Sequence, residues 1–148
     1  MKQLTAKASI QIQKSVEEVF ESIIDPKYMS QYFIESSSGK MEKGKRIEWK
    51  FPEFDAKFPV ECLEITTPNK ISFDWSGGKA HQKVVIDLLK QSDDSTVVKI
   101  EEFSMSVDDE GINQLMRQTE GWANFLACLK AFLEFNINLR KGAFDFIK

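Results

Sequence analysis

The sequence predicts an α+β protein: a curved antiparallel six-stranded sheet wrapped around a long C-terminal helix, with two short helices after the first strand. Three observations support this prediction. Apolar residues alternate with period two in several segments. Short turn-rich stretches separate most of these segments. Apolar residues then recur at helical spacing through the last third of the chain. Five strands in a run indicate an antiparallel meander rather than βαβ units.

The first strand and the two short helices are predicted from the N-terminal part of the chain. Residues 4–12 alternate between apolar and polar side chains, which is typical of a half-buried strand. Ser15 is a helix N-cap followed by acidic residues in the first turn. Pro26 ends that helix, because the residue before a proline is pushed out of the helical region. Residues 27–33 form the second short helix.

The remaining strands and the long helix follow in order. The other strands are predicted at residues 46–51, 56–66, 71–75, 80–89 and 96–105. The alternation is lost at Leu63 and Ile65, which predicts either a bulge there or a strand covered on both faces. The long helix is predicted from residue 109 to 141, with Gly142 just past its end and a bend near Gly121, because an unbroken helix of that length would overreach a domain of this size.

Composition excludes several classes of function. The 148 residues carry a formal charge of −3, without the basic excess of a nucleic-acid binder. The two cysteines, Cys62 and Cys128, fit neither a disulfide framework nor a zinc site, and we interpret them as buried free thiols. The sequence shows no signal peptide and no run of about 20 apolar residues. We therefore expect a cytoplasmic protein with no membrane partner, no metal and no cofactor.

Three local motifs resemble one known family. Residues 15–20 (SVEEVF), with Asp25-Pro26 and Tyr32-Phe33 after them, resemble the opening pattern of the START-like superfamily, also called SRPBCC or Bet v 1-like. Residues 62–75 (CLEITTPNKISFDW) and 121–130 (GWANFLACLK) are similar to motifs of proteins like the C-terminal domain of the activator of heat-shock protein 90 ATPase. The resemblance implies a single START-like domain over residues 1–148, with a helix-grip fold around an interior cavity.

The twelve Phe and three Trp are the unusual feature of the composition. Many of them fall on the apolar sides of predicted strands and of the long helix. They either fill the core or line a cavity suited to an apolar or aromatic ligand. The candidate ligand-binding residues are Tyr32, Phe33, Trp49, Phe51, Phe58, Cys62, Phe73, Trp75, Glu102, Trp122, Phe125 and Leu126.

Two polar residues are candidates for chemistry. If Lys99 and Glu101 face solvent, Glu102 faces inward, where a carboxyl group could act as acid, base or ligand anchor. If the register slips near the strand end, Glu102 is solvated instead. His81 is the only histidine, and the alternation through Lys83 places it on the polar face of its strand. Related proteins often carry a histidine near Glu102, so no catalytic set transfers from the resemblance.

Three functions remain open from the sequence. The first is non-enzymatic binding of a hydrophobic or aromatic small molecule. The second is an interaction protein, related to the activators of heat-shock protein 90 ATPase, that acts on a chaperone through its sheet surface; the resemblance by itself does not imply this activity. The third is a cyclase/aromatase-like enzyme that uses Glu102 or His81. The apolar tail at residues 143–147 either folds back on the sheet or covers a partner subunit, so a homodimer is an alternative.

Overall fold

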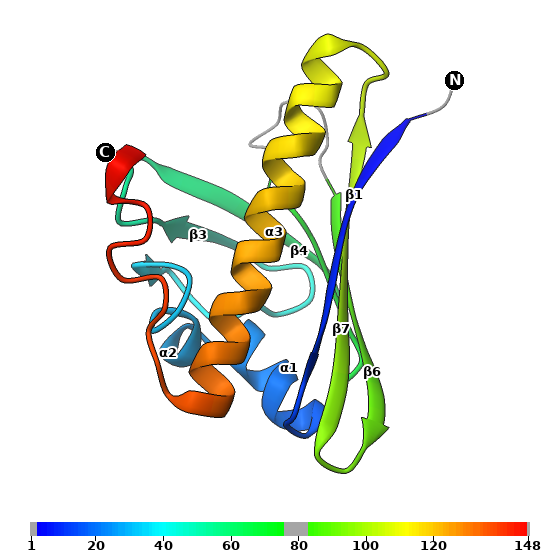
Figure 1. Cartoon of the computed structure of the whole chain (residues 1–148), viewed down its shortest axis with the longest axis vertical. Coiled ribbons are helices and arrows are strands. Elements are labelled where there is room, and N and C mark those ends of the chain that lie inside the picture. The colour runs from blue at the N-terminus through cyan, green and yellow to red at the C-terminus, as the bar shows by residue number, and fades with distance from the viewer. Residues whose placement is uncertain (1–2, 76–82, 148) are drawn as a thin grey trace.

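The computed structural model describes residues 3–75 and 83–147. Its strands form a seven-stranded antiparallel sheet in the order β1-β7-β6-β5-β4-β3-β2. The long helix α3 (Asp109–Phe135) lies across one face of this curved sheet, and the two short helices lie near the C-terminal end of α3 (Figure 1). The predicted α+β class with a long C-terminal helix is confirmed.

The N-terminal elements begin at the predicted caps. Strand β1 (Leu4–Ile12) pairs with β7 (Ser95–Met105). Helix α1 (Val16–Ile24) begins where the Ser15 side chain accepts the backbone N–H of Glu18 at 3.2 Å. Helix α2 (Pro26–Met29) is shorter than the predicted 27–33. The next backbone N–H groups converge on the Met29 carbonyl, which turns the chain instead of continuing the helix.

The middle of the chain contains one more strand than predicted. Strand β2 (Ser36–Ser37) pairs with β3 at the edge of the sheet. A two-residue strand is too short to show alternation, so the sequence pattern does not reveal it. The other strands here are β3 (Arg46–Lys50), β4 (Lys57–Thr66), β5 (Lys70–Asp74) and β6 (Lys83–Ser92). The predicted bulge near Leu63 is confirmed by a register shift between Cys62 and Glu64.

Helix α3 begins at a side-chain cap and ends earlier than predicted. The Asp108 carboxylate accepts the backbone N–H of Gly111 at 2.7 Å. The helix runs through Gly121 without interruption and ends at Phe135, where Asn136 adopts a left-handed conformation with φ 53°. Gly142, expected to cap the helix, has φ 76° in the segment beyond it. A short 3₁₀ helix, η1 (Asp145–Ile147), ends the described chain.

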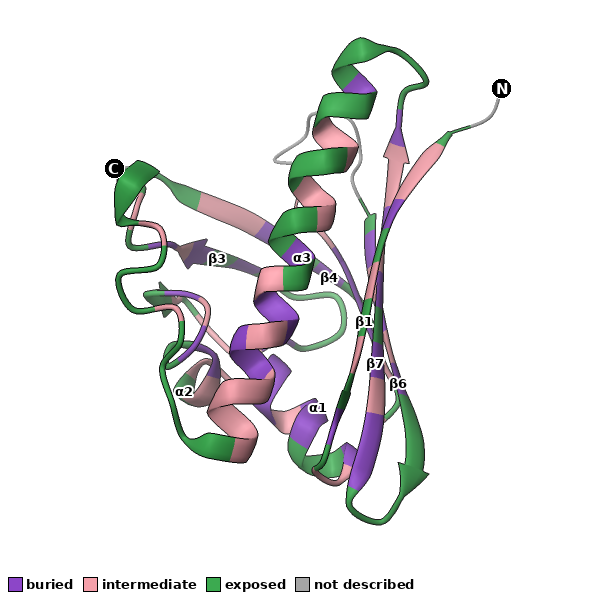
Figure 2. Cartoon of the chain, in the orientation of Figure 1, coloured by how far each residue is buried: buried purple, intermediate pink, exposed green. Residues whose placement is uncertain are grey.

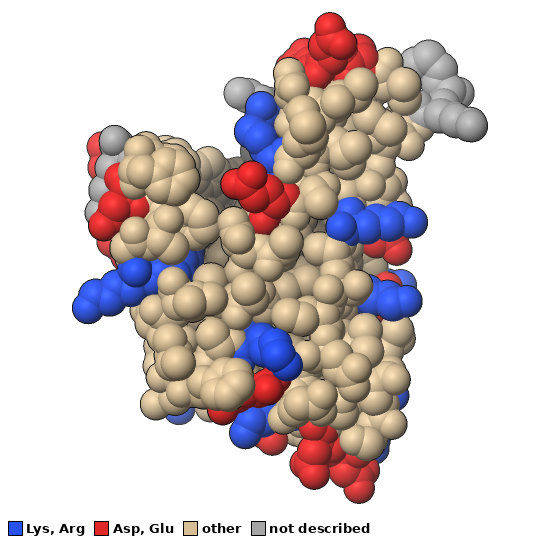
Figure 3. All heavy atoms as spheres, viewed as in Figure 1, with Lys and Arg blue, Asp and Glu red and all other residues tan. Residues whose placement is uncertain are grey.

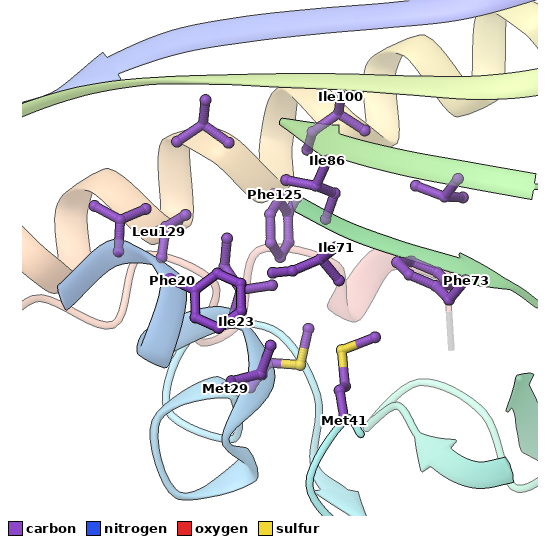
Figure 4. Close-up of a cluster of buried hydrophobic side chains, with 14 of the residues drawn as sticks. Phe20, Ile23, Met29, Met41, Ile71, Phe73, Ile86, Ile100, Phe125 and Leu129 are labelled. Carbon is purple, nitrogen blue, oxygen red and sulfur yellow. The ribbon is translucent and has the colours of Figure 1, made fainter. Parts of the chain in front are cut away.

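The core lies between the sheet and the helices. Figure 4 shows Phe20 and Ile23 of α1 beside Phe125 and Leu129 of α3, facing apolar side chains of β5 to β7. Burial is uneven along α3: its C-terminal half is largely covered, whereas its N-terminal half is mostly half-buried or exposed (Figure 2). The core therefore occupies one end of the space under α3.

Candidate ligand-binding pocket

A pocket of about 420 Å³ lies where three parts of the chain meet. These parts are one side of α3, the loop between β3 and β4, and the residues after the helix, here called the C-terminal segment (residues 136–147). Figure 3 shows this face of the molecule, on which charged groups of both signs are scattered and separated by broad uncharged surface. The lining residues are Tyr32, Phe33, Phe51, Glu53, Phe54, Phe58, Trp75, Gln118, Gly121, Trp122, Asn124, Phe125, Cys128, Arg140, Phe144 and Ile147.

Phe33 is at the centre of the aromatic wall. Its ring centre lies 4.7 Å from that of Phe125 and 5.1 Å from that of Phe51, both edge to face. It also contacts the Trp49 ring edgewise, at 5.8 Å. Edge-to-face pairs at these distances are favourable beyond the area that they bury. The wall is therefore held by contacts among its own rings and offers ring faces and edges to a ligand.

Glu102 holds three of the lining side chains from behind. The Trp122 indole donates to its Oε1 at 2.7 Å, and the Trp75 indole donates to its Oε2 at 3.2 Å. The Gln118 amide donates to both oxygens, at 2.9 and 3.1 Å. Glu102 is 0% exposed and does not line the pocket. Its inward orientation follows the strand alternation, and the alternative of a solvated Glu102 is wrong.

An ion pair joins the C-terminal segment to the β3–β4 loop. Arg140 donates two parallel hydrogen bonds to Glu53, at 2.6 and 3.0 Å, and the two side chains are only 13% and 4% exposed. The guanidinium also lies 5.0 Å from the ring centre of Phe144 and 5.7 Å from that of Phe51. The segment thus folds back onto the protein and forms one side of the pocket.

Tyr32 and Cys128 occupy the inner end of the wall. The Tyr32 hydroxyl donates to the backbone carbonyl of Ser22 at 2.8 Å, so it is engaged inside the protein. Burial raises the pKa of the Tyr32 phenol well above its usual value, with a smaller contribution from Cys128. Burial also raises the pKa of the Cys128 thiol, which Arg140 partly opposes. Both groups therefore stay uncharged near neutral pH.

More than half of the predicted site residues lie in this wall. They are Tyr32, Phe33, Phe51, Phe58, Trp75, Trp122 and Phe125. Their contact with a ligand stays a prediction. His81, the other candidate for acid–base chemistry, lies outside the described residues.

Trp49, Cys62, Phe73 and Leu126 lie in the core rather than on the wall, each 1% exposed. The rings of Phe33 and Trp75, which line the pocket, contact the Trp49 ring edge to face. Trp75 contacts the Phe73 ring in the same way. Leu126 is about 100° around the helix from Phe125. An inward position in a strand or helix therefore does not by itself bring a side chain to the pocket.

Sequence reasoning missed a second group of lining residues. Glu53 and Phe54 come from a loop without periodicity, and Arg140 from a segment expected to be helical. The one available signal was the apolar tail, since Phe144 and Ile147 both line the pocket. Asn124 of α3 also lines the pocket, whereas Arg117 of the same helix is exposed and does not.

A second hollow of about 570 Å³ lies between α1 and the end of α3. It is larger, but Glu17, Glu18 and Glu21 line it together with Ser22 and Asn136. Desolvating several carboxylates opposes binding of an apolar molecule there. The aromatic pocket is therefore the better candidate despite its smaller volume.

Two further features bear on the kind of site. Across the described ranges, no three His, Cys, Asp or Glu side chains come together as metal ligands. None of the helices in these ranges is long and apolar enough to cross a membrane.

The curved antiparallel sheet, the long helix across it and the pocket beside that helix define the START-like, helix-grip class of protein. The chain belongs to the family of Activator of Hsp90 ATPase homolog 1-like proteins, whose model matches residues 13–134. The family resemblance of the three sequence motifs is thereby confirmed. No curated protein matches the chain.

Solved structures show the same fold. A protein of Staphylococcus saprophyticus is 29% identical with a TM-score of 0.80, and the match covers 93% of this chain and 96% of that one. A Colwellia psychrerythraea protein described as an Aha1 dimer is 16% identical with a TM-score of 0.76, covering 89% and 97%. A Plasmodium falciparum protein described as an HSP90 activator is 18% identical with a TM-score of 0.71, covering 88% and 96%.

Proposed function

We propose that the protein binds an apolar or aromatic small molecule in the pocket beside α3, without transforming it chemically. The observation that carries this proposal is the pocket itself: about 420 Å³, with mainly aromatic walls. Ligand sites are typically concave, apolar and about 300–1,000 Å³ in volume, with a few polar groups that orient the ligand. The pocket has both the size and the chemistry of such a site.

The lining groups favour binding over catalysis. Glu102, the candidate acid or base, is separated from the pocket by Trp75, Gln118 and Trp122, which all donate to it. Glu53 and Arg140, the charged side chains among the described lining residues, form an ion pair with each other. A general acid or base must come within hydrogen-bond reach of the reacting atom. Glu102 does not meet this requirement, so the enzyme alternative is the weaker one.

Binding is tested by titration with N-phenyl-1-naphthylamine, an uncharged dye whose fluorescence rises in apolar surroundings. We expect saturable binding of one dye molecule per chain. Phe54 lines the pocket and is 45% exposed, so Phe54→Ala removes a contact without opening the core. This variant should weaken binding about fivefold, which corresponds to part of a Phe side chain's burial.

Phe135→Ala is the matched control. Phe135 is 64% exposed on α3 and does not line the pocket, so its loss should leave dye affinity unchanged. Equal weakening by both variants would show that the dye binds apolar surface in general and would contradict the proposal. Absence of saturable binding to the wild-type protein would contradict it more directly.

Interaction with a chaperone is the second candidate function, and the family match is the observation that favours it. One structural neighbour is described as an HSP90 activator, and it shares this fold at 18% identity. The test is the ATPase rate of the host's Hsp90 with and without the purified protein. Stimulation that saturates with protein concentration supports this function, and an unchanged rate argues against it.

A homodimer is a further proposal about partners. The C-terminal segment leaves Ile137, Leu139 and Phe146 exposed at 52%, 51% and 80%. Such side chains are candidates for contact with a second copy. Sedimentation over a range of concentrations tests this: a monomer throughout would contradict it.

A further inference from the structure

Gly121 is a glycine that neither the backbone nor the packing of the protein requires. It lies in the interior of α3, where glycine is less favourable than alanine. Its φ does not lie in the positive range in which glycine is favoured, and a Cβ built on it would meet no atom within 4 Å apart from its chain neighbours and the adjacent backbone of its own helix. Gly121 nevertheless lines the pocket. Gly121 is exposed, and the space beside its Cα is open.

Two side-chain amides flank this open space. Gln118 and Asn124 stand three residues before and after Gly121, about 60° to either side of it around the helix. Both line the pocket and are half-buried. The Gln118 nitrogen donates to Glu102, so Glu102 fixes the amide in place while its carbonyl oxygen has no partner in the described ranges. The Asn124 amide likewise makes no hydrogen bond to any described residue.

Charge in the pocket is balanced internally. Glu53 and Arg140 are the charged side chains among the described lining residues, and they form a bidentate pair that is mostly shielded from water. A charged ligand would have to separate this pair or enter without a counter-ion, and both are unfavourable. The pocket therefore favours an uncharged ligand.

We propose that the ligand is an uncharged, largely apolar molecule with a hydroxyl or carbonyl oxygen, and that it packs against the α3 backbone at Gly121. A hydroxyl placed there can donate to the Gln118 carbonyl oxygen and accept from the Asn124 amide nitrogen. Glycine at this position permits the close approach, as it does elsewhere where backbone meets ligand. This inference rests on the proposed binding function and names the class of ligand.

The test uses three probes that share a ring system: naphthalene, 2-naphthol and 2-naphthoate, each titrated calorimetrically at pH 7. We expect the wild-type protein to bind 2-naphthol at least tenfold more tightly than 2-naphthoate. Gly121→Ala should raise the melting temperature by about 2–4 °C, because alanine favours the helix. The same variant should weaken 2-naphthol binding at least fivefold, because its methyl group occupies the ligand's space.

Asn124→Leu isolates the polar contact. It keeps a side chain of similar size and should lower the preference for 2-naphthol over naphthalene about tenfold. Glu120→Ala is the control, since Glu120 is exposed on the same helix and does not line the pocket. It should leave all three affinities unchanged. Melting temperatures of the variants report that each is folded.

The outcomes separate this inference from the proposed function. If the probes bind but Gly121→Ala or Asn124→Leu has no effect, the ligand does not sit at Gly121 and the inference is overturned. Tighter binding of 2-naphthoate than of 2-naphthol would overturn the charge argument. If neither the naphthalene probes nor the fluorescent dye binds, the proposed function fails, and this inference fails with it.

Discussion

Trp122 donates its indole N–H to Glu102 at 2.7 Å, and through this bond a buried carboxyl group holds the wall of the pocket. Trp75 and Gln118 donate to the same carboxyl group. All these bonds are accepted by Glu102, and all the donors belong to residues that line the pocket. The role of Glu102 is therefore positional: it orients ligand-facing side chains from a place that no ligand reaches.

Replacing Glu102 by Gln should destabilise the protein although the shape is kept. The amide NH₂ must face one of the N–H donors that now point at carboxyl oxygens, which leaves a buried donor without an acceptor. We expect a loss of about 1–3 kcal/mol in the free energy of unfolding, measured by urea denaturation. Glu101→Gln is the control, because Glu101 is the half-buried neighbour. A Glu102→Gln protein as stable as wild type would contradict the positional role.

The ion pair of Glu53 and Arg140 should stabilise the folded C-terminal segment measurably. Both side chains are mostly buried, so removing one partner leaves the other charge poorly compensated. We expect Arg140→Met and Glu53→Gln each to cost on the order of 2 kcal/mol. The double variant should lose much less stability than the two single variants lose together. Simple additivity in the double-mutant cycle would show that the pair is not coupled.

Alkaline pH should destabilise the protein through Tyr32. Burial raises the pKa of the folded-state phenol, so above about pH 10 the unfolded chain loses its proton first and unfolding becomes easier. Stability should fall by up to about 1.4 kcal/mol per pH unit from this group. Tyr32→Phe should be less stable at pH 7, because the bond to Ser22 is lost, but its stability should fall less steeply above pH 10. Parallel alkaline slopes would refute this.

The two cysteines distinguish pocket occupancy from general stabilisation. Burial raises the pKa of both thiols, so both should react slowly with iodoacetamide at pH 7. Cys128 lines the pocket and Cys62 does not. Saturating N-phenyl-1-naphthylamine should therefore slow the alkylation of Cys128 more than that of Cys62, as followed by peptide mass spectrometry. Equal slowing of the two would mean that the dye acts through global stability instead.

Local pattern predicted much of the fold and part of the pocket. Alternation placed Phe51 and Phe58 on inward sides, and helical spacing placed Trp122 and Phe125 together; all four line the pocket. The same alternation allowed Glu102 to face inward. Periodicity indicates which face of a strand or helix a residue occupies, and for these residues the face alone is enough to predict the position.

Periodicity does not report which distant segment covers that face. Glu53 and Arg140 are separated by 87 residues and lie in a loop and in the C-terminal segment, where no repeat constrains them. The predicted end of α3 at residue 141 is also wrong, because the left-handed Asn136 ends the helix before Arg140. These features depend on tertiary contacts, and so does the covering of Trp49 and Phe73 by other rings.

The most direct test of the binding proposal is a crystal structure of the protein with N-phenyl-1-naphthylamine, at a concentration that the titration shows to be saturating. We predict electron density for the naphthyl ring inside the pocket, against Phe33 and Phe125 and beside Gly121, with the Arg140 and Glu53 pair closed. Density for the dye only on the outer surface, with the pocket filled by the protein's own side chains, would contradict the proposal.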